Sequence, residues 1–583
     1  MRVKRFVFIG ISLSVILALS LAASLTGSRT AFADESNPEV VGPYLAPDLP
    51  SKGIGFIFDD ARDPRMEAAS FLGDTDRFYP NQNGIFDLQS SLTGYCNAVD
   101  DAVCSKAKKL EAVAIMPPCL SPSDNYCIES VYAIIDDKKI SGSYIESVPT
   151  KLEHTFTGDS KLNLASGGTA SVWKIPGVMN GAGNENYVVK TYLRQKSVRN
   201  SDGTVQPFSV NTMTLGFFAT NPVTGSFPPP QANNGGGDGF VKFGCSTNSD
   251  TLCERRTSFA PGARYGIVLR FAKAPVSWFY GRLGKAFIDS KPESYGISMT
   301  VEGEPVLVPV VAGFSPWNQL PPYLQSRYQQ GDGFGYDGNK NGETDPTKWQ
   351  FRALHTADDF AALKAWLPLL SDKATIMTPQ FFLNSVPENA MGNLLSCFTK
   401  GGQVNGLVTS NATAYTPGPP NFNQQDQSLD YQISAPHYTA GGNLMKGTYD
   451  LSIRAEVARC IYGFSSAPIK ASISVVSENG VASVATENVG EKDGWFRLGA
   501  YGFTFSQPKL RVKLTQERAP ESAPVNNGKP ATSPGTTPMS APMTTPKAAN
   551  KPPKSVTIKC VKGKSVKMVT SSYPSCPPGF KKV

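Results

Sequence analysis

The segment Tyr265-Gly-Ile-Val-Leu-Arg-Phe271 establishes the fold class, because its β-branched and aromatic residues stand between Gly262 and Pro275. The segments Tyr187–Tyr192 and Val131–Ile135 have a similar composition. Runs of this kind, bounded by turn residues, predict β-strands. The chain also holds 53 Gly and 46 Pro, which is typical of many short strands joined by turns. The expected fold is therefore mainly β with a minor α part.

The same pattern recurs further along the chain. Four segments in the first half each match a segment in the second half. The pairs are Gly262–Tyr265 and Arg270 against Gly447–Tyr449 and Arg454; Trp278–Gly281 against Cys460–Gly463; Phe287-Ile288 against Pro468-Ile469; and Ile297–Val301 against Ile473–Val476. Two diverged copies of one β unit predict two tandem β-sandwich domains, Ig-like or jelly-roll-like. The alternative is that such Tyr and Gly patterns are common in any β protein.

A helical segment is expected between the two repeats. Thr356-Ala-Asp-Asp359 matches a capping box. The apolar residues behind it recur at helical spacing, and they are Phe360, Leu363, Trp366, Leu367 and Leu370. Thr378-Pro379 is expected to open a second helix towards Phe398.

These patterns divide the chain into regions with distinct expected structures. They are a signal peptide (1–33), an N-terminal mixed region with two Cys loops (34–159), β-sandwich repeat 1 (160–315), a loop with the helical segment (316–398), β-sandwich repeat 2 (399–515), a disordered linker (516–553) and a basic C-terminal module (554–583).

The first residues predict export. Basic residues at Arg2, Lys4 and Arg5 precede an apolar run from Phe6 to about Leu25, and Ala31-Phe-Ala33 follows. This order is typical of a secretory signal that is cleaved after Ala33. The alternative is an uncleaved anchor, because the run approaches the ~20 residues that span a bilayer. After cleavage no transmembrane segment is expected, and the protein is expected to be extracellular, either secreted or attached to the cell wall or cell surface.

The net charge of +8 is unevenly distributed. Residues 1–33 carry four basic residues and no acid, and residues 554–583 carry seven Lys and no acid, so the body between them is acidic. The region 516–553, rich in Pro, Thr, Ser and Ala, lacks the apolar residues needed to fold and is expected to be a disordered spacer.

The C-terminal module is expected to be a β-hairpin, since Val556–Val561 and Ser565–Val569 flank a Lys-Gly-Lys turn. Its charge predicts an anionic partner, which outside a cell is a wall polymer, a lipid head group or stray nucleic acid. An anionic cell-wall polymer is the expected partner, and no nucleic acid partner is expected. The candidate anchor residues are Lys559, Lys562, Lys564, Lys567, Lys581 and Lys582. The alternative is that these lysines only keep a small module soluble.

The ten Cys form an even set in a chain with an export signal, which favours disulfides over metal binding. Cys96 and Cys104, Cys119 and Cys127, and Cys245 and Cys253 each enclose seven residues, Cys560 and Cys576 stand alone in the tail, and Cys397 and Cys460 would join a helical segment to a strand. The first four can also pair as Cys96 with Cys127 and Cys104 with Cys119.

One segment resembles the start of a calcium loop, with oxygen-bearing side chains at alternate positions and Gly342 at the sixth. The candidate ligands are Asp337, Asn339, Asn341, Glu343 and Asp345. Lys348 stands where a calcium loop carries its bidentate Glu. Calcium in an irregular loop is one interpretation and a polar turn is the other, and no further cofactor is expected.

The aromatic residues Trp278, Tyr280 and Trp495 are candidates for a sugar-binding platform, and the alternative is that they fill a core. A glycan or a protein would then be the ligand of the body.

Catalytic motifs are scarce. G-x-S-x-G and H-E-x-x-H do not occur, and the chain has only three His. Asp59-Asp60, Asp136-Asp137 and Asp358-Asp359 are adjacent pairs, and adjacent strand residues point to opposite faces. A non-enzymatic protein is therefore expected, and a secreted carbohydrate-active hydrolase with a carboxylate-based site is the alternative.

A further set of segments carries a resemblance to known proteins. Its members are Ser277–Leu283, Arg459–Phe464, Asp493–Trp495 with Phe503–Ser506, Ile558–Lys564 and Pro574–Phe580. On these segments the sequence resembles exported proteins of Gram-positive actinobacteria, from about residue 260 to 515 and in the tail. The resemblance implies an attachment role for the tail and no catalytic residues. We therefore expect a secreted or wall-associated surface protein that displays β-sandwich domains for binding or structural roles.

Overall fold

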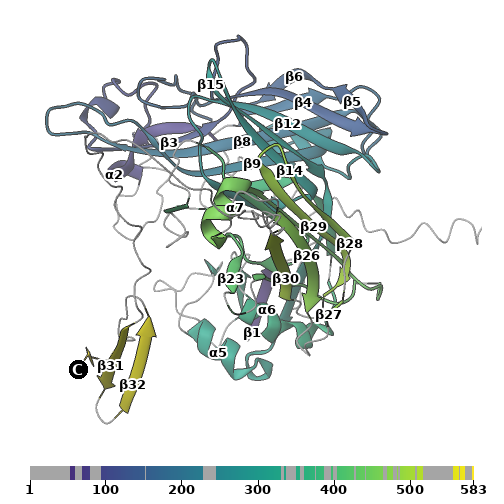
Figure 1. Cartoon of the computed structure of the whole chain (residues 1–583). Coiled ribbons are helices and arrows are strands. Elements are labelled where there is room, and N and C mark those ends of the chain that lie inside the picture. The colour runs from purple at the N-terminus through teal and green to yellow at the C-terminus, as the bar shows by residue number, and fades with distance from the viewer. Residues whose placement is uncertain are drawn as a thin grey trace, which may run out of the picture. The chain divides into compact units, whose positions relative to one another are not determined.

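The computed structural model divides the chain into two compact units, Met1–Ala519 and Pro520–Val583. It describes residues 53–58, 69–78, 94–150, 153–227, 245–329, 334–335, 349–354, 360–374, 376–386, 396–397, 403–423, 425, 428–439, 441–463, 469–476, 482–483, 486–505, 509–516, 556–562, 565–571 and 581–582. The first unit is built mostly of strands with a few short helices, which confirms the predicted fold class (Figure 1).

One large sheet runs through most of the first unit. In spatial order its strands are β2 (Phe71–Asp74), β3 (Lys109–Ile115), β8 (Asn186–Val198), β9 (Ser209–Thr224), β20 (Phe382–Ser385), β13 (Trp278–Arg282), β21 (Gly406–Ser410), β25 (Lys446–Arg454), β29 (Trp495–Thr504) and β28 (Thr486–Lys492). Four strands branch from it, and they are β6 (Ser143–Val148), β7 (Ala170–Lys174), β10 (Cys245–Asn248) and β11 (Leu252–Arg256). The predicted strands at Tyr187 and Val131 are confirmed, in β8 here and in β4 below.

A five-stranded sheet packs on the first half of the large sheet. Its order is β14 (Gly284–Glu293), β15 (Gly296–Glu304), β12 (Arg264–Phe271), β4 (Cys127–Ile135) and β5 (Lys138–Ser141). Leu193 and Phe217 of the large sheet meet Ile267 and Val301 of this sheet in one buried core. Figure 1 shows β4 and β12 lying across β8 and β9.

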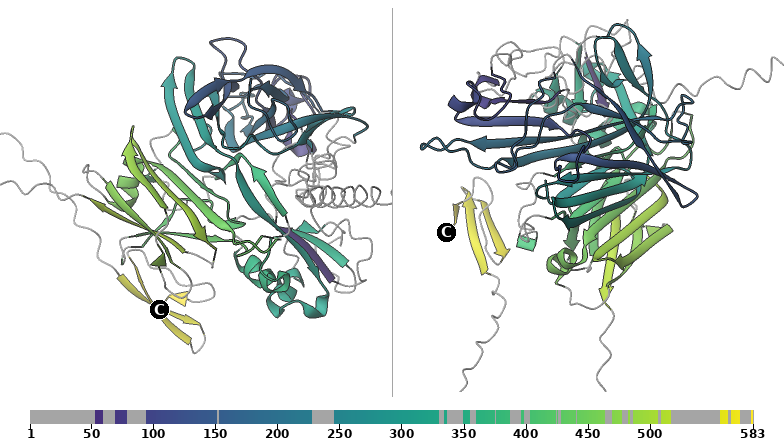
Figure 2. Two further views of the ribbon diagram at one scale, coloured as in Figure 1. Left: turned by 90° about the vertical axis from the view of Figure 1, so that its right-hand side faces the viewer. Right: turned by 90° about the horizontal axis from the view of Figure 1, so that it is seen from above.

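A six-stranded sheet packs on the second half of the large sheet. Its order is β22 (Ala414–Tyr415), β24 (Ser428–Ser434), β30 (Lys509–Gln516), β26 (Ile469–Val476) and β27 (Ala482–Ser483), with β23 (Asn421–Asn423) beside β24. Leu451 and Leu498 of the large sheet meet Leu429 and Ile433 in a second core. Figure 2 shows these green strands as a stack separate from the blue one.

Strand β13 connects the two sandwiches. It pairs antiparallel with β20 on one side and parallel with β21 on the other. Because successive strand residues point to opposite faces, Phe279 enters the first core while Trp278 and Tyr280 enter the second. The two β-sandwiches therefore share one continuous sheet.

The predicted equivalence of the two repeats is wrong at the level of strands. Trp278–Gly281 lies in strand β13, whereas Cys460–Gly463 ends helix α7 (Ala455–Tyr462), with Gly463 in the left-handed conformation. Strand β12 pairs with β15 and β4, whereas β25 pairs with β21 and β29. Similar Tyr and Gly spacing thus arises in segments with different neighbours.

The remaining elements form a smaller layer. A sheet of β17 (Phe334–Gly335), β18 (Trp349–Leu354), β1 (Gly53–Phe58), β16 (Val306–Ser315) and β19 (Ile376–Gln380) accompanies α5 (Pro322–Gln329), α6 (Phe360–Trp366), η5 (Trp317–Gln319) and η6 (Leu367–Leu370). Helix α6 confirms the expected helical segment, while Thr356–Asp359 lies outside the described residues. The expected second helix is wrong, because Thr378-Pro379 lies in strand β19, and strand pairing with β16 overrides the local helix-start signal.

Four disulfides are formed among the residues that the structure describes. They join Cys96 to Cys104, Cys119 to Cys127, Cys245 to Cys253, and Cys397 to Cys460. The first two confirm pairing between neighbours and exclude the crossed alternative. Cys460 lies in helix α7, so the fourth bond does not end on a strand as predicted.

Among the described residues, no helix has the length and apolar composition needed to cross a membrane.

The second unit contains the predicted hairpin. Strands β31 (Val556–Lys562) and β32 (Ser565–Ser571) pair antiparallel, and β33 (Lys581–Lys582) pairs with β31. Cys576, residues 1–33 and most of the linker lie outside the described residues, so the tail disulfide and the signal peptide stay predictions.

Candidate functional site

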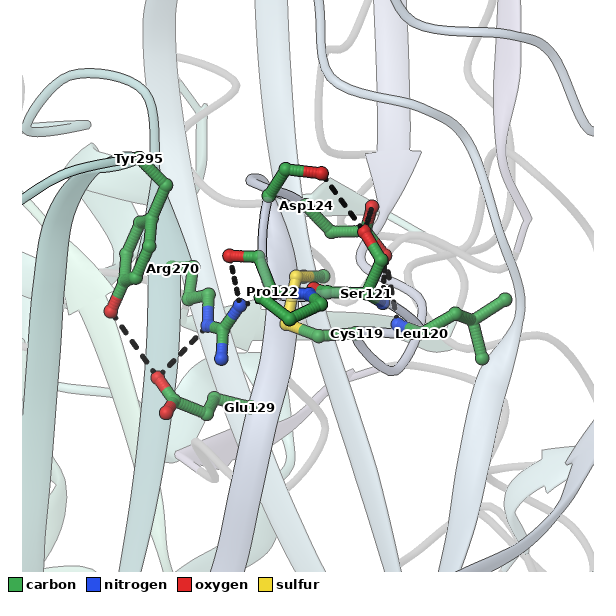
Figure 3. The surroundings of a disulfide bond; sticks show 10 residues. Cys119, Leu120, Ser121, Pro122, Asp124, Glu129, Arg270 and Tyr295 are labelled. Carbon is green, nitrogen blue, oxygen red and sulfur yellow. Dashed lines mark hydrogen bonds and ion pairs between the residues drawn. A yellow bond between two sulfur atoms is a disulfide. The ribbon is translucent and has the colours of Figure 1, made fainter.

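The loop Cys119–Cys127, which we call the stapled ring, is the best-defined surface feature of the first unit. Its disulfide closes a ring at the start of strand β4 (Figure 3). The Cys119 N–H donates to the Ile128 carbonyl at 2.9 Å, and the Ile128 N–H donates to the Pro117 carbonyl at 2.8 Å. Both ends of the ring are therefore fixed to the five-stranded sheet.

Asp124 holds the ring from within. Its Oδ2 accepts the N–H groups of Leu120 and Ser121, each at 2.8 Å, and its Oδ1 accepts the Ser121 hydroxyl at 2.5 Å. The bond from the Ser121 hydroxyl is the largest cause that lowers the pKa of the Asp124 carboxyl. The carboxylate therefore stays charged, and the ring braced, down to a pH below the usual range of Asp.

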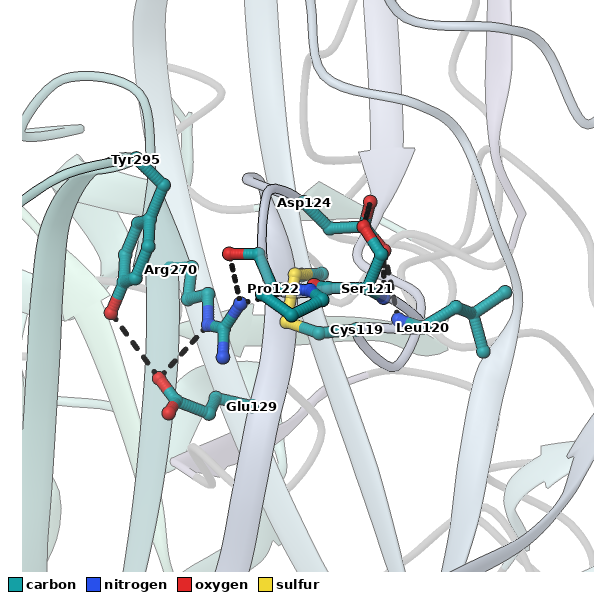
Figure 4. Close-up of polar contacts among 9 residues, drawn as sticks. Cys119, Leu120, Ser121, Pro122, Asp124, Glu129, Arg270 and Tyr295 are labelled. Atoms are coloured by element: carbon teal, nitrogen blue, oxygen red, sulfur yellow. Dashed lines mark hydrogen bonds and ion pairs between the residues drawn. A yellow bond between two sulfur atoms is a disulfide. The ribbon is translucent and has the colours of Figure 1, made fainter.

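Arg270 holds the ring from the neighbouring strand β12. Its Nη1 donates to the carbonyls of Ser121 at 3.1 Å and Pro122 at 3.0 Å, and its Nε donates to Glu129 at 3.0 Å (Figure 4). Its guanidinium lies 4.6 Å from the centre of the Tyr295 ring. The bond to Glu129 raises the pKa of Arg270, so the brace is a permanent cation.

The braces leave one large apolar side chain in solvent. Leu120 is 88% exposed, and Figure 3 shows it pointing away from Arg270, Glu129 and Tyr295. Tyr126, in the same ring, is buried. The stapled ring is thus a braced loop with a single large apolar group exposed to solvent.

Removing the inner brace should loosen the ring. In Asp124→Ala, the N–H groups of Leu120 and Ser121 lose their acceptor, at a cost of about 1 kcal/mol. We expect their amide hydrogen exchange to become about fivefold faster. Asn125→Ala is the control, because no hydrogen bond joins the Asn125 side chain to another described residue. Equal exchange rates in both variants would show that Asp124 does not hold the ring.

A second polar pair joins Asp372 and His437. The His437 N–H donates to Asp372 Oδ1 at 3.0 Å, and the ring Nδ1 hydrogen-bonds Oδ2 of the same carboxylate. Asp372 and its neighbour Ser371 both have φ of 55°, an unusual backbone for residues other than Gly. Such a pair can orient a general base. In the part of the chain that the structure describes, no hydroxyl or thiol hydrogen-bonds Nε2, so the pair shows no complete catalytic group.

The predicted aromatic platform is wrong. Trp278, Tyr280 and Trp495 are all buried, so a sugar ring at the surface cannot stack on them. The indole N–H of Trp278 donates to the Pro417 carbonyl at 3.2 Å, and that of Trp495 donates to Asp289 at 3.1 Å. These residues fill and fasten the two cores instead.

The other sequence-predicted residues are placed only in part. The calcium candidates Asp337, Asn339, Asn341, Glu343 and Asp345 lie outside the described residues. Within the described ranges, no three His, Cys, Asp or Glu side chains come close enough to hold a metal ion. Asp136 and Asp137 form the tight β4–β5 turn with φ of 49° and 60°, which makes them turn residues.

The candidate anchor residues lie on the short strands of the second unit. Lys559 is exposed on β31. Lys562 belongs to β31, Lys567 to β32, and Lys581 and Lys582 to β33, while Lys564 lies outside the described residues.

Comparison of the chain with models of known protein families, and with curated proteins, gave no match.

Cysteine spacing located the stapled ring, but the sequence analysis did not predict what braces it. Arg270 stands 149 residues from Ser121 and Tyr295 stands 166 residues from Glu129. The pairing of β12 with β4 places Arg270 beside the ring, and the pairing of β12 with β15 brings Tyr295 to the same place.

Proposed function

We propose that this chain is an exported, non-enzymatic binding protein held at the cell envelope by its basic tail. The observation that carries the proposal is the stapled ring, a disulfide-closed and doubly braced surface loop that presents Leu120 to solvent. Disulfides persist in oxidising compartments outside the cytoplasm, which supports export.

Attachment through the tail is supported by charge and by organisation. The last thirty residues carry seven Lys and no acid, and they fall in a compact unit distinct from the acidic body. Clustered lysines attract anionic polymers such as those of a cell wall, without a specific pocket. The body would then be the displayed part of the protein.

Sedimentation with isolated cell-wall sacculi tests the attachment. We expect residues 34–583 to sediment with sacculi at low salt, and residues 34–519 to stay in solution. Binding should be lost at 1 M salt, where the screening length falls to about 3 Å. A variant with Lys559, Lys562 and Lys567 changed to Gln should bind more weakly.

A matched variant separates the tail from general positive charge. Lys106, Lys108 and Lys161 are exposed on the body, and changing all three to Gln should leave sedimentation unchanged. Equal losses in both triple variants, or undiminished binding by residues 34–519, would contradict attachment through the tail.

A further inference from the structure

We infer that the stapled ring is an inhibitory loop for a secreted endopeptidase with an apolar primary pocket, with Leu120 as the side chain that enters the pocket. This deepens the binding part of the proposed function and does not depend on the tail.

The first support is the exposure of Leu120. At 88% it is far more exposed than the other large apolar side chains at the surface, such as Leu444 at 52% and Met179 at 49%. The ring's neighbouring residues Ser121 and Ser123 are polar. A single exposed apolar side chain on a braced loop fits a narrow pocket that accepts one residue, as a protease primary pocket does, and does not fit a broad apolar surface.

The second support is rigidity. A ligand already held in its bound shape loses little conformational freedom on binding. The disulfide, the Asp124 carboxylate and the Arg270 guanidinium hold the ring on three sides. A flexible loop with an exposed Leu is a preferred site of proteolysis, whereas this ring cannot unfold locally without breaking those contacts.

The third support is the state of the peptide bond between Leu120 and Ser121. Among the described residues, no backbone N–H outside the helices and strands donates to the Leu120 carbonyl, so no such donor competes with the oxyanion-binding N–H groups of a protease. On the other side of this bond, the Ser121 N–H is held by Asp124 and the Ser121 carbonyl by Arg270. If the bond is attacked, the leaving amine of Ser121 stays in place, which favours re-formation of the bond over release.

The test uses two purified serine endopeptidases as probes. Chymotrypsin has an apolar primary pocket and trypsin has an acidic one. We expect residues 34–583 to inhibit chymotrypsin in a chromogenic peptide assay and to leave trypsin unaffected. Leu120→Gly should weaken the inhibition of chymotrypsin at least about 30-fold, the effect of losing a central binding side chain. Leu120→Arg should transfer inhibition to trypsin.

Two controls address folding and the role of the brace. Leu444→Gly, at another exposed Leu, should inhibit chymotrypsin as well as the parent chain does. Arg270→Ala should convert the inhibitor into a substrate, with water added across the Leu120–Ser121 bond, and mass spectrometry after reduction would detect the two products. The circular dichroism of all variants should match that of the parent chain.

The outcomes separate this inference from the proposed attachment. Residues 34–519 should inhibit as well as the full mature chain, whatever the result with sacculi. Absence of inhibition at about 10 μM, a concentration at which an interface of standard size is occupied, would overturn the inference. Rapid cleavage of the parent chain at Leu120–Ser121, or trypsin unaffected by Leu120→Arg, would also overturn it.

Discussion

Arg282→Ala should lower the free energy of unfolding of the second sandwich by about 4 kcal/mol. Arg282 lies in strand β13 and is completely buried. Its Nη1 donates to the carbonyl of Ser410 at 2.9 Å and to that of Ala412, and its Nη2 donates to the carbonyl of Thr413 at 3.2 Å. Removal of the guanidinium would take these hydrogen bonds away from buried carbonyls, and each loss costs about 1–3 kcal/mol.

The arginine also contacts an aromatic ring of the same core. Its guanidinium lies 4.5 Å from the centre of the Tyr415 ring. The strand that joins the two sandwiches is thus fastened to residues 410–415 by one side chain. Urea unfolding, monitored by the fluorescence of the buried Trp278 in the same strand, would measure the loss.

Arg199 provides a matched control. It also binds backbone carbonyls, with donors to Ala107 at 3.2 Å and Cys104 at 2.9 Å, but it is only partly buried. Water can replace its hydrogen bonds, so Arg199→Ala should cost about 1 kcal/mol. Equal losses for the two variants would show that burial of Arg282 does not set its contribution.

Arg282 illustrates which features the sequence could predict. The strands at Tyr187 and Tyr265 follow from local composition, and the short-loop disulfides follow from spacing between neighbouring Cys. Both are local properties of the chain. By contrast, Arg282 and the carbonyls it binds are 128 to 131 residues apart, and nothing in the segment around Arg282 marks it as buried.

The shared sheet was missed for the same reason. The alternation of side chains between the two faces of Trp278–Arg282 is a local signal. It does not indicate that the two faces of this one strand enter two different cores. The Tyr and Gly spacing around Tyr265 and Tyr449 predicts a repeat, but in the structure the two residues share only their burial within strands. Burial repeats in any β protein, whereas strand neighbours are set by pairing between distant segments.

In the candidate site, too, the sequence predicts local features and does not predict contacts between distant segments. Cysteine spacing predicted a ring at Cys119–Cys127, and the aromatic residues Trp278 and Trp495 were wrongly considered as a surface platform. Large aromatic side chains contribute most to a core, so their presence in a strand favours burial over display. The residue that the structure does display, Leu120, carries no sequence signal beyond its place beside Cys119.

Asp450→Asn should remove part of the pH dependence of stability between about pH 4 and pH 7. Asp450 lies in strand β25, is 4% exposed, and accepts a hydrogen bond from the Tyr501 hydroxyl. Burial raises the pKa of its carboxyl to about 7, although Tyr501 and the backbone N–H groups of Lys285 and Ala286 act to lower it. The carboxyl therefore prefers to be protonated in the folded protein at pH values where the unfolded chain has released the proton.

The sign of the effect follows from proton binding. The folded state holds a proton that the unfolded state releases near pH 3.8, so the contribution of Asp450 to stability is complete below that pH and is lost as the pH rises to about 7. A shift of this size corresponds to roughly 4 kcal/mol, since one pKa unit is about 1.4 kcal/mol. Asn keeps an acceptor for Tyr501 and carries no charge. The variant should consequently be more stable than the parent chain at pH 8 by up to that amount, and similar to it at pH 4.

Comparison of the two pH profiles isolates Asp450 from other groups that titrate in the same range. Burial also raises the pKa of Glu153 to about 7, and this contribution is present in both proteins and cancels in the difference.

Tyr501→Phe offers a second check. Loss of the hydroxyl removes a group that lowers the pKa of Asp450, so the pH-dependent loss of stability should extend to higher pH. Parallel profiles for Asp450→Asn and the parent chain between pH 4 and pH 8 would show that Asp450 is charged in the folded protein throughout this range, and that its hydrogen bonds outweigh the cost of its burial.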